Sequence, residues 1–305
     1  MASSPPSFVQ DFAPLGVAIR LIATDEDLLR AAMAAYAEWP TETPSEARLE
    51  LRLGFGADVS RGGMETDIGI KGSRLEIRGA GGLGWADATT GRAEFLAAKA
   101  AVVGPEALTE ALDTLLLFLL CRSGRTPVHA AGIVHAGRAL VLAGPSGAGK
   151  STLALAAQRR GLVILSDDTV YIQLRPALRV WGFRRPLHVF PEDASRFTGV
   201  EPVGQRLRAG KLKAVVPIVH DASAPLVADR AALIVLSRGE RLALDPLEPA
   251  AAIAALGPLE AGFDLLTEAS ARAMDALAAA GAWRLTLTHD PVAAVDFLVE
   301  RLPSL

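Results

Sequence analysis

A glycine-rich segment at residues 144–151 has the residue types and spacing of a phosphate-binding loop. Its sequence, Gly-Pro-Ser-Gly-Ala-Gly-Lys-Ser, lies between an all-apolar run at 139–143 and a helix-competent run at 151–157. Glycines let the backbone turn so that successive N–H groups and the start of the next helix point at phosphate oxygens. This context predicts a P-loop that binds ATP or GTP. The residues predicted to bind the nucleotide are Gly144, Pro145, Ser146, Gly147, Ala148, Gly149, Lys150, Ser151 and Thr152.

Within this loop two side chains have predicted roles. Lys150 would bridge the β- and γ-phosphates, and the Ser151 hydroxyl would coordinate Mg²⁺. P-loops occur in switches, motors, transport ATPases and kinases, so the motif predicts the ligand and leaves the reaction open.

Two aspartates, Asp167 and Asp168, follow a predicted strand at 162–165, one short helix after Lys150. Ligands of α/β sheets bind at the carboxyl ends of the strands. One carboxylate can hold Mg²⁺, and the other can accept a proton from an incoming hydroxyl. The alternative is that one aspartate only begins a turn. The spacing argues against ABC-type ATPases, whose acidic strand lies far downstream, and no Asn-Lys-x-Asp segment is present to read guanine.

Composition excludes other classes of function. The chain has 305 residues, 31 basic and 34 acidic, with a net charge of -3, so no overall basic field would gather nucleic acid or an anionic membrane. The single cysteine, Cys121, lies in an apolar run and is predicted to be a core residue of a protein in a reducing cytosol. That run is shorter than a membrane helix, and residues 1–10 lack signal-peptide features, so a cytoplasmic location is expected.

The length of the chain and the secondary structure predicted from its sequence indicate an α/β protein with two domains. Residues 1–125 are predicted to form a smaller, β-rich α+β domain, and residues 126–305 the P-loop domain. The first contains a strand at 16–22, a helix at 25–36, a loop at 41–45, a sheet at 47–85 and a helix at 105–121. The second contains strands at 130–134, 139–143, 162–165, 231–236 and 284–288, helices at 150–160, 250–280 and 291–301, and a polar loop at 191–210.

Three segments in this order resemble the catalytic core of the HPr serine kinase family. They are His-Ala-Ala at 129–131, the glycine-rich segment, and Leu-Ser-Asp-Asp at 165–168, and the interval between them matches the family without a gap. The chain before His129 differs from the N-terminal domain of the HPr enzymes. It is more similar to HPr-kinase-related proteins encoded beside peptide-maturation genes, including lasso-peptide precursor kinases.

The resemblance implies an HPr-kinase-like fold for residues 126–305 and transfer of the γ-phosphate to a serine hydroxyl. It implies that Asp168 is the general base, that Asp167 and Ser151 hold Mg²⁺, and that His129 lines the γ-phosphate side. The acceptor would be a serine on a small protein or precursor peptide. The N-terminal domain and residues 190–210 would be its docking surfaces.

Beyond Asp168 the resemblance is weaker. Lys213 occupies the place of a family arginine and would neutralise charge on the transferring group, or it is a solvated strand-edge lysine. The family's Glu-x-Arg-Gly-x-Gly segment is absent, so kinase activity without phosphorolysis is predicted. Glu192 is the candidate replacement for its acidic metal ligand, and Arg184 or Arg185 for a phosphate or substrate contact, with surface placement as the alternative.

Two other classes of function remain open from the sequence. One is a small-molecule kinase, or a relative of the nucleotide-dependent phosphoenolpyruvate carboxykinases, although the extra His and Lys metal ligands of the latter are not visible. The other is a switch or scaffold that binds nucleotide without transferring phosphate. Assembly into a homo-oligomer is also left open.

Overall fold

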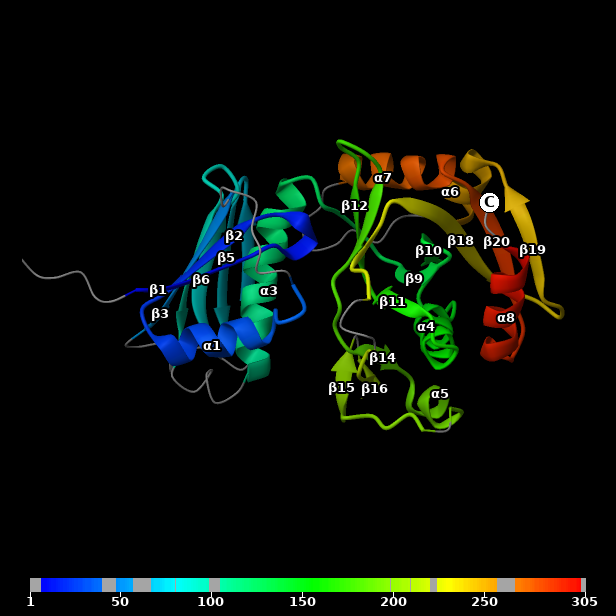
Figure 1. The fold of residues 1–305 in the computed structure, drawn as a ribbon, viewed down its shortest axis with the longest axis horizontal. Helices are drawn as coiled ribbons and strands as arrows, with labels where there is room; N and C mark the ends of the chain where they lie inside the picture. The colour runs from blue at the N-terminus through cyan, green and yellow to red at the C-terminus, as the bar shows by residue number, and fades with distance from the viewer. Residues whose placement is uncertain are drawn as a thin grey trace, which may run out of the picture. The chain divides into compact units, whose positions relative to one another are not determined.

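The computed structural model describes residues 7–39, 48–56, 67–79, 81–98, 105–197, 199–208, 210–219, 224–256 and 267–302. The chain forms two compact units, Met1–Ser123 and Gly124–Leu305. Each unit has sheets and helices, which makes the protein mixed α/β with several sheets (Figure 1). In the described part, no helix is both long enough and apolar enough to cross a membrane.

The first unit is built on a seven-stranded sheet in the order β1-β2-β3-β7-β6-β5-β4. Its strands are β1 (Phe8–Phe12), β2 (Ile19–Ala23), β3 (Leu49–Phe55), β4 (Asp67–Lys71), β5 (Arg74–Gly79), β6 (Gly82–Asp87) and β7 (Arg92–Ala97). The other elements are the short 3-10 helix η1 (Pro14–Gly16), α1 (Glu26–Ala34) and α3 (Pro105–Arg122). The helices α1 and α3 pack on one face of the sheet (Figure 1).

Sequence patterns explain this packing. In β3, Leu49, Leu51 and Leu53 are buried and alternate with polar residues, as expected for a strand with one covered face. Helix α1 begins after Asp25, whose carboxylate accepts a hydrogen bond from the Leu28 amide at 3.0 Å. Cys121 is buried in α3, as predicted.

The main sheet of the second unit has six strands in the order β11-β9-β10-β18-β20-β19. Its strands are β9 (Ala131–His135), β10 (Arg138–Ala143), β11 (Val163–Ser166), β18 (Arg230–Arg238), β19 (Ala243–Leu247) and β20 (Ala282–Leu287). Strands β10, β18 and β20 are parallel. Because β9 is antiparallel to both β10 and β11, β11 runs in the same direction as β10.

Two smaller sheets complete the second unit. One has the order β17-β13-β12-β8 and the other β14-β16-β15. Their strands are β8 (Thr126–Val128), β12 (Val170–Gln173), β13 (Arg179–Gly182), β14 (Leu187–Val189), β15 (Gly204–Arg208), β16 (Lys211–Val216) and β17 (Val227–Ala228). The helices are α4 (Lys150–Arg159), α5 (Pro191–Ser195), α6 (Pro249–Leu256), α7 (Thr267–Ala279) and α8 (Pro291–Arg301).

The main sheet is covered on both faces, which explains the continuous apolar runs of its strands. From β10, Leu140 and Leu142 pack in the core formed with α4 and α8. Its alternate residues Val141 and Ala143 pack in the core formed with α6 and α7. Figure 1 shows α7 and α6 on one side of this sheet and α4 and α8 on the other.

Most of the predicted elements of the second unit are present, with small shifts in their ends. The prediction of a loop at 191–210 was wrong, because this segment contains α5 and β15. Helix α5 begins with proline and has two acidic residues in its first turn, which is a local helix-start signal. Strand β15 depends on pairing with β16. The predicted loop at 41–45 and the middle of the predicted helix at 250–280 lie outside the described residues.

Candidate active site

Three segments that are separate in the sequence meet at one edge of the main sheet. The glycine-rich loop, residues 144–151, follows the carboxyl end of β10, and Asp167 and Asp168 follow the carboxyl end of the co-directional β11. His129 precedes β9, which starts at this edge because it runs the opposite way. The topology therefore places all three groups where ligands of α/β sheets bind.

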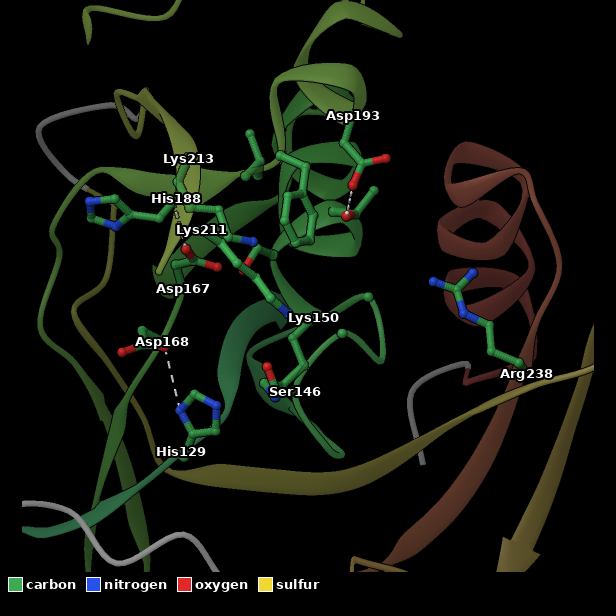
Figure 2. Close-up of a pocket in the computed structure, with 16 residues that line it drawn as sticks. His129, Ser146, Lys150, Asp167, Asp168, His188, Asp193, Lys211, Lys213 and Arg238 are labelled. Atoms are coloured by element: carbon green, nitrogen blue, oxygen red, sulfur yellow. Dashed lines mark hydrogen bonds and ion pairs between the residues drawn. The ribbon is translucent and has the colours of Figure 1, made fainter. Parts of the chain in front are cut away.

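A cleft of about 620 Å³ opens at this edge. Its lining residues come from the segment before β9, the glycine-rich loop with the start of α4, the ends of β11 and β18, the strands β14 and β16, and α5. They are His129, Ser146, Gly147, Gly149, Lys150, Ser151, Thr152, Asp167, Asp168, His188, Val189, Phe190, Asp193, Lys211, Lys213 and Arg238. Figure 2 shows Lys150, Asp167 and Asp168 around the same space. Of the predicted nucleotide-binding residues, Gly144, Pro145 and Ala148 shape the loop and do not line the cleft.

The glycines of the loop adopt backbone conformations that other residues rarely reach. The φ angles are 156° at Gly144, 84° at Gly147 and 107° at Gly149. Gly149 is the N-cap of α4, and no side chain caps this helix end. Because Lys150, Ser151 and Thr152 of its first turn line the cleft, this helix end suits the binding of an anion.

The Lys150 side chain lies along the loop and is buried. Its Nζ donates hydrogen bonds to the carbonyl oxygens of Gly144 at 2.7 Å and Pro145 at 3.3 Å. The ammonium group thus lies at the mouth of the loop, where phosphate oxygens could replace these carbonyls as acceptors.

Asp167 is a buried carboxylate that is only partly satisfied. Its Oδ2 accepts a hydrogen bond from the His188 amide at 2.9 Å, whereas Oδ1 has no hydrogen-bond partner of normal geometry among the described residues. The pKa of Asp167 is raised to about 6, mainly by burial and to a smaller extent by the charge of Asp168. The His188 amide, the Ser151 hydroxyl and the Lys213 ammonium oppose this rise. An unpaired buried carboxylate oxygen close to a serine hydroxyl suits a divalent cation.

The predicted residues Asp167 and Ser151 therefore fit a Mg²⁺ site. No cluster of three or more His, Cys, Asp or Glu side chains suitable for a metal occurs in the described part of the chain. Mg²⁺ is usually held by one or two protein ligands together with phosphate oxygens and water.

Asp168 and His129 line the cleft and point toward each other (Figure 2). Their Oδ1 and Nδ1 atoms are 3.4 Å apart, and the Asp168 side chain is 62% exposed. The imidazole can therefore orient the carboxylate while the cleft leaves it accessible to a hydroxyl. This arrangement suits proton acceptance by Asp168.

Lys213 reaches the cleft from β16, as its predicted role requires. Its Nζ lies 3.1 Å from the centroid of the Phe190 ring, and this cation–π contact helps to position the Lys213 side chain. Burial lowers the pKa of the Lys213 ammonium, and the charge of Asp167 opposes this effect. Lys211, two residues earlier on the same strand face, lines the cleft as well.

Glu192 does not occupy the position predicted for it. It is exposed and does not line the cleft, whereas its neighbour Asp193 does. Asp193 Oδ2 accepts a hydrogen bond from Thr152 Oγ1 at 2.9 Å, and Oδ1 pairs with Arg196 at 3.5 Å. Successive residues of a helix point about 100° apart, so α5 turns only one of the two carboxylates toward the cleft.

Arg184 and Arg185 make structural contacts outside the cleft. Arg184 is buried and donates to the carbonyl oxygens of Ile164 at 2.9 Å and Pro225 at 2.7 Å, which fastens two segments of backbone together. Arg185 stacks over the Phe183 ring at 4.5 Å. Neither arginine lines the cleft, so their predicted contact with phosphate or substrate is replaced by structural contacts.

Arg238 lines the cleft but was not predicted from the sequence. It ends β18, which is parallel to β10, and Figure 2 shows it on the far side of the loop from Asp168 and His129. Its guanidinium donates to the Thr288 carbonyl oxygen at 3.3 Å. In the sequence, Arg238 follows the strongly apolar run at 231–236. This position indicates a place at the cleft only when β18 is known to lie beside β10.

Comparison with known proteins gives a partial structural match. No protein-family model matches the chain, and no curated protein matches it. Among solved structures, the Hpr(Ser) kinase/phosphatase from Coxiella burnetii is similar over 58% of this chain and 95% of that chain, with 19% sequence identity and a TM-score of 0.31. The resemblance concerns part of the fold at low sequence identity.

Proposed function

We propose that the protein is a Mg²⁺-dependent kinase that transfers the γ-phosphate of ATP or GTP to a serine hydroxyl on a small protein or peptide. The observation that carries this proposal is the arrangement of Lys150, Asp167 and Asp168 around one cleft at the carboxyl ends of β10 and β11. A phosphate-binding cation, a metal-binding carboxylate and an accessible carboxylate are the groups that phosphoryl transfer needs.

The glycine-rich loop binds the phosphates in this proposal. The amides at the start of α4 donate to phosphate oxygens, and Lys150 exchanges its carbonyl acceptors for oxygens of the β- and γ-phosphates. Ser151 and Asp167 would hold Mg²⁺, which supplies charge neutralisation at the phosphates when bound. Lys213 stabilises the negative charge on the transferring group.

Asp168 takes the proton of the acceptor. The serine oxygen forms a bond to the γ-phosphorus while the bond from that phosphorus to the bridging oxygen breaks, and the nucleoside diphosphate leaves. The serine proton passes to Asp168, whose carboxylate is oriented by His129 at 3.4 Å. Positioning and electrostatic stabilisation carry most of the catalysis in such a reaction.

The proposal is tested by transfer of labelled γ-phosphate to an array of serine-containing peptides, with Asp168→Asn as the variant. Loss of the general base should reduce the transfer rate by about 10²- to 10⁴-fold. Nucleotide affinity, measured by calorimetry, should change less than about threefold. Asp275→Asn, an exposed aspartate on α7, serves as the matched control and should transfer at the wild-type rate.

Each alternative function has a distinct outcome. Nucleotide binding without transfer to any alcohol acceptor would indicate a switch or scaffold and would refute the kinase proposal. Transfer only to small alcohols would indicate a small-molecule kinase. Transfer by Asp168→Asn at the wild-type rate would show that another group accepts the proton.

A further inference from the structure

Exposed apolar side chains gather in and beside the hairpin formed by β15 and β16. In the described part of the chain, seven large apolar side chains are strongly exposed, and four of them lie between residues 203 and 219. They are Val203 at 70%, Leu207 at 71%, Leu212 at 49% and Val219 at 74%. Leu207 and Leu212 lie in the hairpin strands, Val203 precedes β15, and Val219 follows β16. Such a concentration in one short stretch is characteristic of an interaction surface, whereas single exposed apolar residues are ordinary.

The hairpin has two chemically different faces. Its register pairs Leu207 directly with Leu212, so their side chains share one face. Ala214 and Val216, which follow Leu212 along β16, lie on that face and are buried in the core that includes α4. The two leucines therefore extend an apolar strip outward from the core, and we call Val203, Leu207 and Leu212 the hairpin strip.

The opposite face of the hairpin is basic and belongs to the cleft. The register pairs Arg206 with Lys213, and Lys211 lies on the same face as Lys213. Both lysines line the cleft that holds Asp168. From residue 203 to 219 the sequence has four basic residues and no acidic one, in a chain whose net charge is -3. Charge complementarity therefore favours an acidic partner.

Strand β15 also offers a backbone edge. It is the outer strand of the sheet β14-β16-β15 and pairs with β16 on one side, with no strand on its other side among the described residues. An extended polypeptide can add to such an edge through main-chain hydrogen bonds while its alternate side chains meet the two faces. Figure 1 shows β15 and β16 at the end of the second unit opposite α7.

We propose that the β15–β16 hairpin is the docking site of the acceptor, an extended segment with alternating acidic and apolar residues. This inference rests on the proposed function, since it concerns the substrate of the same cleft. The acidic side chains lie on the face of the hairpin that carries Arg206 and Lys211, the apolar side chains cover the hairpin strip, and the serine lies beyond them toward Asp168. A membrane surface fits less well, because the basic face lines the cleft and cannot lie flat on lipid together with the opposite apolar face.

The test is peptide binding to the full chain, measured by fluorescence anisotropy without nucleotide. The probe is a short fluorescein-labelled peptide in which Glu and Leu alternate ahead of one Ser. Comparison peptides replace every Glu with Lys or every Leu with Ser. We expect the Glu–Leu peptide to bind at least about tenfold more tightly than either, which corresponds to about 1.4 kcal/mol.

The protein variants locate the binding surface. The double variant Leu207→Ser, Leu212→Ser changes exposed side chains outside the cleft lining and should weaken the Glu–Leu peptide by at least about tenfold. The matched control is Ile68→Ser, Ile70→Ser, two exposed apolar residues of β4, which should bind as the wild type does. Equal binding of the peptide by the hairpin variant would overturn the proposal.

Other occupants of the strip give different results. If the hairpin variant changes the sedimentation of the protein but not its peptide binding, the strip joins copies of the chain and the proposal is wrong. Dependence of phosphatidylserine-vesicle binding on Leu207 and Leu212, with no peptide selectivity, would also refute it. If only the kinase proposal is wrong, the protein would still bind the Glu–Leu peptide selectively but would transfer no γ-phosphate to it.

Discussion

Replacing Asp167 with asparagine should remove a pH-dependent destabilisation of the second unit. Burial raises the pKa of Asp167 from its ordinary value of 3.8 to about 6. Since each tenfold change in proton affinity corresponds to about 1.4 kcal/mol, keeping this carboxylate ionised in the fold costs roughly 3 kcal/mol at neutral pH. The amide oxygen of the substituted side chain can still accept the hydrogen bond from the His188 amide, so the variant removes the charge and keeps this contact.

The sign of the effect follows from the raised pKa. Between about pH 4 and pH 6 the folded protein holds a proton on Asp167 that the unfolded chain has lost, so the free energy of unfolding falls as pH rises through this window. The stabilising contribution is fully present below about pH 4 and lost above about pH 6. Relative to Asp167→Asn, the wild type should lose about 2 kcal/mol between about pH 4.5 and pH 7.5.

The assay is urea unfolding in EDTA at several pH values, with a transition fitted for each of the two units. Asp275→Asn is the control, because this aspartate is exposed on α7, and its pH dependence should match that of the wild type. Parallel pH dependences of the wild type and Asp167→Asn would contradict this prediction, since they would mean that burial does not disfavour the ionised carboxylate.

Three further substitutions test two lysines of the cleft and the packing of β13 against Leu165. Lys150→Met should weaken nucleotide binding by about 10- to 100-fold by calorimetry, because a charged hydrogen bond to phosphate is lost; unchanged affinity would contradict this contact. Lys213→Ala should lower kcat by about 10²-fold or more, with partial recovery in Lys213→Arg, whereas a wild-type kcat in Lys213→Ala would indicate a strand-edge lysine. Gly182→Ala would place a Cβ 2.1 Å from the Leu165 carbonyl oxygen, so unfolding free energy should fall by about 3 kcal/mol or more; an unchanged melting temperature would exclude this close approach.

Local sequence signals were sufficient to predict the glycine-rich loop and the two aspartates of the cleft. The glycine-rich loop and the two aspartates each follow an apolar run, and the rule that ligands bind at strand ends places them together without knowledge of the strand order. His129 needed the family resemblance, because a single histidine before a strand carries little information by itself. The structure brings His129 within 3.4 Å of Asp168.

The remaining positions depended on topology and helix phase, which a single sequence does not reveal. Arg238 reaches the cleft because β18 lies beside β10 and runs parallel to it. Asp193 lines the cleft and Glu192 does not, because α5 turns only one of these two adjacent residues toward the glycine-rich loop. Arg184 has the charge for a phosphate contact, yet burial directs its donors to backbone carbonyls.

The most direct measurement is a crystal structure with Mg²⁺ and a non-hydrolysable ATP analogue. We expect the terminal phosphate to lie within hydrogen-bond distance of Lys150 Nζ, on the side of the loop that faces Asp168 and His129. A terminal phosphate directed toward Arg238 and away from Asp168, or a nucleotide bound outside the cleft, would contradict it.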